Sequence, residues 1–245
     1  MSRRELIGVD GLPEVRPGDD LAGMIAARAQ LEPGDVLVVA QKVVSKSEGR
    51  IVELSSVTAG PDALRIAPLL VAKPDPRMVQ VALDESVRVL RSERVLITET
   101  RHGFVCANSG VDHSNTGGSD TLTLLPVDPD ASAARLRARL HELTGSDVGV
   151  IVSDTFGRPW RLGIVNVALG VAGLPALIDL RGTRDDDGNE LHATVVAVAD
   201  EIAAAAGLVM GKTARTPAVI VRGLELIGSG TGRDLIRPPA EDLFR

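Results

Sequence analysis

Acidic and hydroxyl side chains directly follow an apolar run at residues 148–152. The segment after this run reads SDTFGRPWR and covers residues 153–161. The run is typical of a buried strand that ends where the polar segment begins, and ligand-binding groups are common at the ends of parallel strands. The oxygens of Asp154 and Thr155 suit a hard cation such as Mg²⁺ or Mn²⁺. The alternative is that Asp154 caps the following segment, a frequent role for aspartate.

Two guanidinium groups lie in the same segment. Arg158 and Arg161 are three residues apart. Their forked donors match the oxygens of a phosphate or a carboxylate. The segment therefore combines groups for a cation with groups for an anion.

A second polar segment, NSGVDHSN at 108–115, also follows a predicted strand. Asp112 is a second candidate metal ligand, and the Asn115 amide is a candidate hydrogen-bonding group. The same residue types are ordinary turn formers, so this segment alone is a weak signal. His113 is predicted to be exposed.

The third polar segment is QKVVSKSEG at 41–49. Gln41, Lys42 and Lys46 supply an amide and two ammonium groups that suit a triphosphate. The alternative is a charged hairpin edge that protects a strand. Together the three segments suit phosphoryl transfer, which depends mainly on positioning and charge stabilisation.

Three glycine-containing or acidic segments resemble ligand-binding loops, but each has a simpler explanation as a helix end, a surface loop or a turn. The segment at 207–213 has too few residues between its glycines for a Walker loop and follows a helix, so Gly211 is as well explained as a helix cap. Lys212 stays a candidate phosphate contact. The segment at 228–232 is predicted to be a flexible surface loop. The acidic run at 185–188 is predicted to be a solvated turn.

Apolar periodicity and turn residues predict the elements that position these groups. Strands are expected at 36–40, near 43–44, and at 95–98, 104–107, 122–125, 148–152, 176–180 and 218–221. Helices are expected from Asp19 or Asp20 to Arg28, and at 75–90, 130–143 and 191–209, the last being the longest. Residues 60–75, with three prolines, are the expected flexible excursion. The irregular mixture favours an α+β or irregular α/β fold over a doubly wound sheet.

Composition limits the function classes. The chain has 245 residues and a net charge of −6, so it lacks the basic surface of a nucleic-acid-binding protein. The N-terminal segment lacks the apolar stretch of a secretory signal, and no apolar run is long enough to span a membrane. A cytoplasmic protein is expected. The single cysteine, Cys106, is predicted to be a small core residue.

With these segments identified, the chain resembles the coenzyme F-420-0:L-glutamate ligase family (gamma-glutamyl ligases). Matching segments run in family order along almost the whole chain. They are GLPE at 11–14, QKVVSKSEG at 41–49, GVDHSN at 110–115, LLPVDPD at 124–130, SDTFGRPWR at 153–161, RDDDGNELHAT at 184–194, VADEIAAAA at 198–206 and TPAVIVRG at 216–223. The closing LIRPPAEDLFR resembles the end of the N-terminal ligase domain in the two-domain actinobacterial enzyme.

The resemblance implies an α+β, mixed-sheet ligase fold. Residues 1–245 would form a single ligase domain, which two subdomains could make up. The resemblance also implies an intertwined homodimer. It also implies GTP-dependent addition of L-glutamate to a deazaflavin coenzyme precursor. The expected cofactors are Mg²⁺ or Mn²⁺, as two ions, with K⁺ as a further candidate. Metal ligands are implied at Asp112, Asp154 and Thr155. Nucleotide contacts are implied at Leu12, Pro13, Glu14, Val15, Gln41, Lys46 and Asn115, with Met210, Gly211 and Lys212 as further candidates.

The expected mechanism activates a carboxylate by phosphorylation. The γ-phosphoryl group of GTP would move to the acceptor's carboxylate, and the glutamate amine would then displace phosphate. Asp154, Arg158 and Arg161 are the candidate catalytic residues, with Lys46 as a further stabilising cation. One departure from the family pattern is Gly207, where the relatives carry an acidic residue, and this puts the second metal site in question.

Two other functions use the same residues. A metal-dependent phosphohydrolase would use water as the nucleophile, and GTP loss would then need neither glutamate nor deazaflavin. A non-catalytic deazaflavin-binding module would bind its ligand without nucleotide turnover. The match of both carboxylate segments favours the ligase.

Overall fold

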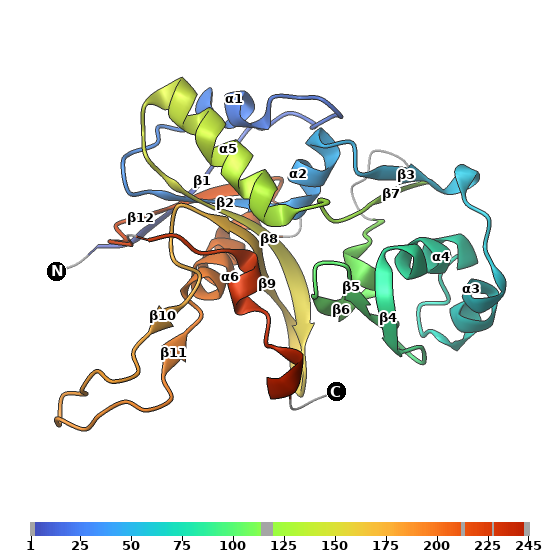
Figure 1. Ribbon diagram of the computed structural model, residues 1–245. Coiled ribbons are helices and arrows are strands. Elements are labelled where there is room, and N and C mark those ends of the chain that lie inside the picture. Colours follow the sequence, from blue (N-terminus) through green and yellow to red (C-terminus); the bar gives the residue numbers. More distant parts are fainter. Residues whose placement is uncertain (1–2, 114–119, 212–213, 227, 243–245) are drawn as a thin grey trace.

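A five-stranded mixed sheet forms the centre of the protein in a computed structural model that describes residues 3–113, 120–211, 214–226 and 228–242 (Figure 1). The strand order is β1-β12-β2-β8-β9. The strands are β1 (Glu5–Gly8), β12 (Ala218–Arg222), β2 (Val36–Ala40), β8 (Gly149–Arg158) and β9 (Arg161–Ala172). Only β2 and β8 pair in parallel. The predicted α+β class with a mixed sheet is confirmed.

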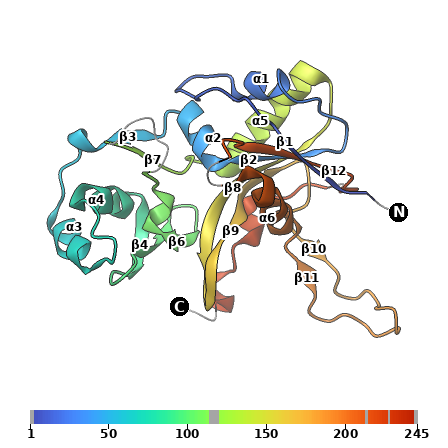
Figure 2. The same ribbon diagram turned by 180° about the vertical axis from the view of Figure 1, so that it is seen from behind.

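Helices cover both faces of this sheet, as Figures 1 and 2 show from opposite sides. Helices α1 (Leu21–Ala26) and α5 (Pro129–Thr144) pack on one face, and α6 (Val198–Met210) packs on the other. Strand β2 is nearly all apolar because it is buried on both faces. Its alternate residues Leu37 and Val39 face α1 and α5, whereas Val36 and Val38 face α6.

Local signals set the ends of the sheet-covering helices. The Asp128 side chain accepts a hydrogen bond from the Ala131 N–H, and α5 ends at Gly145 with φ of 72°. The Asp20 carboxylate caps α1 through the Gly23 N–H. That N–H, and after it Arg139 on α5, lower the pKa of Asp20. Aspartate caps and a left-handed glycine are sequence-readable, so these helices were predicted within a few residues.

A lobe made from residues between about 50 and 125 lies beside the sheet (Figure 1). It contains the strand pair β3 (Ile51–Glu53) and β7 (Thr121–Thr123), the helices α3 (Pro61–Ile66) and α4 (Pro76–Asp84), and the strands β4 (Ser86–Arg91), β5 (Ile97–Thr100) and β6 (Val105–Ala107). The expected flexible excursion at 60–75 is wrong. Ala63, Ile66 and Leu70 are buried against α4, and this apolar contact orders the segment.

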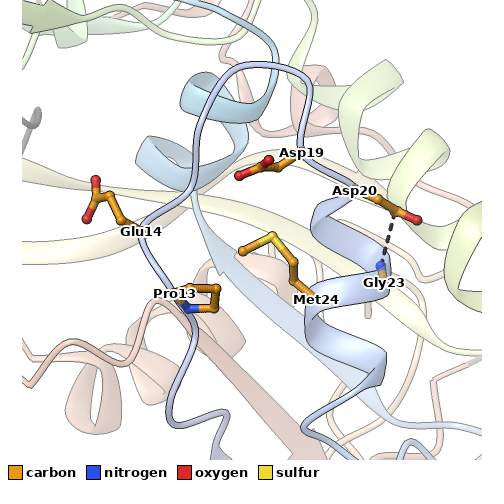
Figure 3. A pocket seen from close by; sticks show the side chains of 6 residues that line it. All are labelled: Pro13, Glu14, Asp19, Asp20, Gly23 and Met24. Atoms are coloured by element: carbon orange, nitrogen blue, oxygen red, sulfur yellow. Dashed lines mark hydrogen bonds between the residues drawn. The ribbon is translucent and has the colours of Figure 1, made fainter.

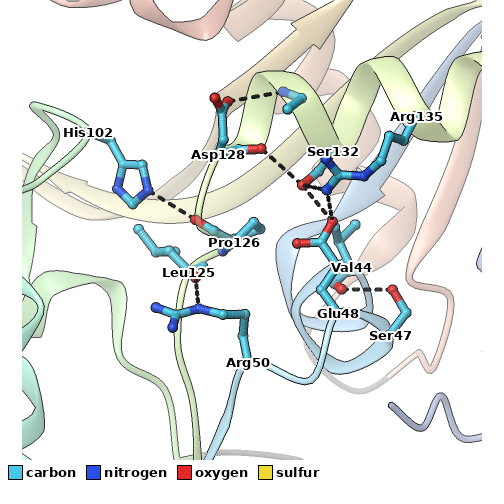
Figure 4. Close-up of polar contacts among 11 residues, drawn as sticks. Val44, Ser47, Glu48, Arg50, His102, Leu125, Pro126, Asp128, Ser132 and Arg135 are labelled. Atoms are coloured by element: carbon cyan, nitrogen blue, oxygen red, sulfur yellow. Dashed lines mark hydrogen bonds and ion pairs between the residues drawn. The ribbon is translucent and has the colours of Figure 1, made fainter. Parts of the chain in front are cut away.

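Polar contacts hold the lobe to residues 125–128, the segment that leads into α5 (Figure 4). The Arg50 side chain donates to the Leu125 carbonyl at 2.9 Å and pairs with Glu85 at 2.7 Å. The His102 ring nitrogen Nε2 lies 3.0 Å from the carbonyl oxygen of Pro126. The lobe is therefore anchored by side chain to backbone bonds near one end of the sheet.

Three element predictions are wrong because tertiary contacts outweigh local preference. Residues 43–44 belong to helix α2 (Gln41–Ser47), in which Val44 packs into the core. The predicted helix at 75–90 ends at Asp84, and the β-branched Val87 and Val89 enter strand β4. Helix α6 starts at Val198 instead of 191, so α5 with 16 residues is longer.

The chain between β9 and α6 forms a long excursion with a short ladder at its base (Figure 1). Strands β10 (Ile178–Asp179) and β11 (Val195–Val196) pair there. The predicted acidic turn is confirmed, because the Asp185 carboxylate accepts hydrogen bonds from the Asp187 and Asn189 N–H groups.

The predicted flexible loop at 228–232 is wrong. A Cβ built on Gly232 would lie 2.0 Å from the Leu169 carbonyl oxygen, so the chain there packs directly on β9. The Gly232 N–H donates to the Asp130 carboxylate. Among the described residues, no helix has the length and apolar character needed to cross a membrane.

Candidate active site

The parallel pair β2 and β8 brings two of the polar segments together. Ala40 at the end of β2 lies beside Ser153 of β8, and α2 begins at the next residue, Gln41. Gln41 and Asp154 therefore continue from neighbouring points on the carboxyl side of parallel strands, where α/β proteins commonly bind ligands.

The prediction that β8 ends at 153–154 is wrong. The strand continues to Arg158, and Asp154 pairs with Val167 while Thr155 pairs with Asn166. These residues look like a loop in sequence because they are polar. Strand β9 supplies the backbone hydrogen bonds that keep them extended.

Asp154 and Thr155 serve opposite sides of β8, because successive strand side chains alternate. Phe156, which shares the side of Asp154, lies edge-on to Phe104 of the lobe with ring centroids 6.4 Å apart. Asn166, across from Thr155, lies 3.4 Å from the Ser153 hydroxyl and 3.5 Å from the sulfur of Met210 on α6. Asp154 thus faces the lobe side and Thr155 the α6 side.

The lobe lies close to Asp154. Burial, and after it the nearby charge of Asp154, raise the pKa of the Cys106 thiol on β6 to about 12. Cys106 is buried, so its predicted role as a core residue is confirmed. The turn at Asn108–Gly110 then leads from β6 toward Asp112.

Asp112 is fixed by its backbone and paired through its side chain. Its N–H donates to the Thr123 carbonyl at 3.0 Å, and the Thr123 N–H donates back at 2.8 Å. The ammonium of Lys42 lies 2.7 Å from its carboxylate. Lys42 is the second residue of α2, so this ion pair brings the second and third polar segments together.

Thr123 adds a hydroxyl oxygen beside Asp112. Residues opposite each other in an antiparallel bridge project to the same face. Thr123 is fully buried, and its hydroxyl oxygen has no hydrogen-bond partner among the described residues. A carboxylate and a hydroxyl are hard oxygen donors, so they fit Mg²⁺ or Mn²⁺. No cluster of three or more acidic, histidine or cysteine side chains suited to a metal occurs in the described part of the chain.

The predicted nucleotide contacts on α2 are buried. The Gln41 amide oxygen accepts from the Ser45 hydroxyl at 2.8 Å, and Lys46 pairs with Glu14. This pair fastens the loop before α1 to α2. A hairpin edge is thereby excluded for the two lysines, because both lie on a helix.

Two residues of the loop at 12–15 pack against the core, and the other two line a pocket. Leu12 packs on the core and Val15 is buried, so their side chains do not line the pocket. Pro13 and Glu14 line a cavity of about 460 Å³ (Figure 3). The remaining lining residues are Asp19, Asp20, Gly23 and Met24.

The two predicted arginines lie at the far end of the β8–β9 hairpin. Arg158 donates to the Leu162 carbonyl at 2.9 Å, and Arg161 is exposed. Arg158 lies four positions along the strand from Asp154, a span of about 13 Å. Within one chain these arginines are not brought to Asp154.

Comparison with known proteins identifies the family of the chain. The family model described as F420-0:gamma-glutamyl ligase matches residues 11–223. The chain belongs to this ligase family. A protein of Methanopyrus kandleri named coenzyme F420:L-glutamate ligase is 49% identical over 239 residues, covering 95% of this chain and 94% of the relative. A Methanocaldococcus jannaschii protein of the same name is 43% identical over 245 residues, covering 98% and 96%.

In this member of the gamma-glutamyl ligase family, the end of α6 meets the Thr155 side of β8. Met210 is buried there and Gly211 ends the helix with φ of 51°. The interpretation of Gly211 as a helix cap is confirmed. Lys212 and Asn115, both predicted nucleotide contacts, lie outside the described residues.

The sequence did not predict Thr123 or Asn166 as residues of the site of this family member, and it did not predict that Lys42 pairs with Asp112. Lys42 was noted as a cation, but nothing in its spacing showed that it reaches Asp112. Thr123 lies in an unremarkable apolar strand. Asn166 interrupts the apolar alternation of β9, which is the one signal that could have drawn attention to it.

Proposed function

We propose that the protein is a GTP-dependent ligase that adds L-glutamate to the deazaflavin precursor coenzyme F420-0. Family membership supports the ligase reaction. The observation that carries the proposal is the Lys42–Asp112 pair, which joins α2 to the segment after β6. Helix α2 follows β2, whose last residue, Ala40, lies beside Ser153, the neighbour of Asp154 on β8. This site combines carboxylates with a cation, as transfer of a phosphoryl group between anions requires.

The proposed reaction has two steps. An oxygen of the acceptor's carboxylate attacks the γ-phosphorus, the bond to the β-phosphate oxygen breaks, and GDP leaves. The amine of glutamate then attacks the acyl carbon and loses a proton, the carbon–oxygen bond breaks, and phosphate leaves. The products are the glutamylated acceptor, GDP and phosphate.

Asp112 would hold a divalent cation, with the Thr123 hydroxyl as a neighbouring oxygen. Asp154 would contribute an oxygen ligand on the lobe side of β8, and Thr155 would contribute one on the α6 side. The two residues would therefore bind two different ions. The ions would neutralise phosphate charge. Lys42 and Lys46, both on α2, would offer ammonium groups to the phosphates, and Lys46 would first have to leave its pair with Glu14.

We also propose that the protein acts as a homodimer. The β8–β9 hairpin carries Trp160, Leu162 and Ile164 at exposed positions, 83%, 99% and 56% accessible. Such an apolar projection is typical of an interaction surface, and a second copy is the expected partner. Arg158 and Arg161 at the hairpin tip are remote from Asp154 in their own chain. In a dimer they would contribute to the partner's site instead.

Mass spectrometry of a complete reaction tests the ligase proposal. The mixture contains protein, GTP, Mn²⁺, L-glutamate and coenzyme F420-0, and each component is omitted in turn. A product heavier by one glutamyl unit, dependent on every component, is expected. GTP loss without glutamate or deazaflavin would instead identify a phosphohydrolase, and deazaflavin binding without any turnover would identify a binding module.

A further inference from the structure

The Lys42–Asp112 ion pair joins a fixed carboxylate to a flexible cation. Asp112 is held by two backbone hydrogen bonds to Thr123. Lys42 carries its ammonium on a four-carbon stem that can turn without moving α2. The side chains are 20% and 33% exposed, so solvent ions can reach the pair. One partner can therefore leave while the other stays in place.

The other lysine of α2 is held differently. Lys46 pairs with Glu14 and its side chain is only 6% exposed, whereas that of Glu14 is 60% exposed on a loop. At Asp112 the carboxylate is the ordered partner and a buried hydroxyl lies on the same face. Of the two carboxylates, that of Asp112 has the better surroundings for a hard cation.

An ammonium and a divalent cation cannot both neutralise the same oxygen at close range, because they repel each other. We propose that Lys42 occupies the Asp112 carboxylate until a divalent cation displaces it, and that displacement frees the ammonium for the polyphosphate substrate. This inference rests on the proposed metal role of Asp112. It makes Lys42 a positioning residue that couples the two binding events.

Thermodynamic linkage fixes the direction of the effect. A cation that must displace Lys42 binds more weakly than one that need not displace it. A polyphosphate that captures the released ammonium assists the cation, and by reciprocity the cation assists the polyphosphate. Removing the Lys42 charge should therefore strengthen cation binding alone and weaken the coupling.

Electron paramagnetic resonance can measure free Mn²⁺ during titration of the intact protein, with and without GDP. For Lys42→Met we expect Mn²⁺ affinity without GDP to rise about three- to tenfold, and the gain in Mn²⁺ affinity caused by GDP to shrink. Lys42→Arg keeps the charge and should resemble the wild type. Circular dichroism verifies that each variant is folded.

Arg135→Met is the charge-matched control. Arg135 pairs with Glu48 at 2.7 Å just after α2, so this variant also removes one positive charge from beside a carboxylate. An equal rise in Mn²⁺ affinity in both variants would reduce the Lys42 effect to general electrostatics and overturn the inference. Unchanged or weaker Mn²⁺ binding in Lys42→Met would overturn it as well.

Asp112→Asn separates this inference from the proposed function. If it abolishes Mn²⁺ binding while Lys42→Met changes nothing, the metal role stands and the displacement fails. If the wild type and Asp112→Asn bind Mn²⁺ equally, the metal role of Asp112 fails and the inference fails with it.

Discussion

Asp154 and Thr155 are adjacent in the chain but face opposite sides of β8. The lobe side carries Asp154, close enough to Cys106 to affect its pKa. The α6 side carries Thr155, across from Asn166. Substitutions at the two positions therefore probe two different surroundings, although they change neighbouring residues.

We expect Asp154→Asn to lower the rate of glutamyl addition by about 10²- to 10³-fold, the typical cost of losing one preorganised electrostatic contact in a transition state. The side chain keeps its shape and loses its charge. Steady-state product formation by mass spectrometry measures the effect. Asp62→Asn, on the exposed surface of α3, is the matched control and should keep full activity. Wild-type turnover in Asp154→Asn would remove Asp154 from the proposed site.

A side chain added at Gly207 would crowd Asn166 of β9. A Cβ at this position would lie 3.0 Å from the amide group of Asn166. That amide also contacts Ser153 and Met210. An acid at 207 therefore requires Asn166 to move.

Gly207→Asp should lower the free energy of unfolding by about 1–3 kcal/mol, the usual cost of overpacking. Adding Asn166→Ala should recover part of that loss, because the crowded amide is removed. Urea denaturation of the single and double variants measures the coupling. Leu208→Asp places the same acid one residue later, at a position 83% exposed, and controls for a new charge near the helix end. Strictly additive effects of the two substitutions would argue against the contact.

At the scale of elements, a bulge in β9 separates the covered sheet from the projecting hairpin. Val152 pairs with Gly170 but Ser153 pairs with Ala168, so Leu169 is the extra residue. The Ala168 N–H, next to this extra residue, donates to the Asp200 carboxylate of α6 at 2.8 Å. On the other side, Asp130 of α5 accepts from the Val171 N–H. Carboxylates from both helix layers thus hold the bulge.

Asp200→Ala should cost about 1–3 kcal/mol of stability, because a part-buried N–H loses its acceptor. Asp200→Asn keeps an oxygen acceptor and should cost less. Urea midpoints at pH 7 measure both. Equal losses in the two variants would mean that the hydrogen bond to Ala168 contributes little.

The same variants predict a pH dependence. Burial raises the pKa of Asp200 above its ordinary value near 3.8, so the folded state binds the proton more tightly than the unfolded state. Stability contributed by this group therefore increases as pH falls from above the raised pKa toward about 4. The stability of the wild type relative to Asp200→Asn should rise over that window.

At the scale of the whole molecule, the tip of the β8–β9 hairpin exposes apolar side chains. Leu162 is 99% exposed. If the tip is the contact between two copies, Leu162→Asp should shift the protein toward monomer, because an ionised group would have to be buried. Light scattering with size-exclusion chromatography measures the mass. Leu64→Asp changes a leucine that is 56% exposed on α3 and should leave the mass unchanged. A monomeric wild type would contradict the proposed dimer.

The sequence by itself determined the features that depend on nearby residues. The continuous apolar run of β2 and the Asp128 and Gly145 ends of α5 needed only local rules of burial and capping. The order of the polar segments also predicted the family, which the comparisons confirm. Asp112 and Asp154 could be predicted as metal ligands from the sequence because carboxylate oxygens bind hard cations.

The tertiary structure alone decided how those features meet. Polar residues after 153 stay in a strand because β9 pairs with them, and residues 86–91 leave the predicted helix because β5 pairs with them. Lys42 and Asp112 are 70 positions apart, and only the packing of the lobe beside α2 brings their charges to 2.7 Å. Backbone pairing and ion pairing between distant segments depend on the whole fold, so no local pattern contains them.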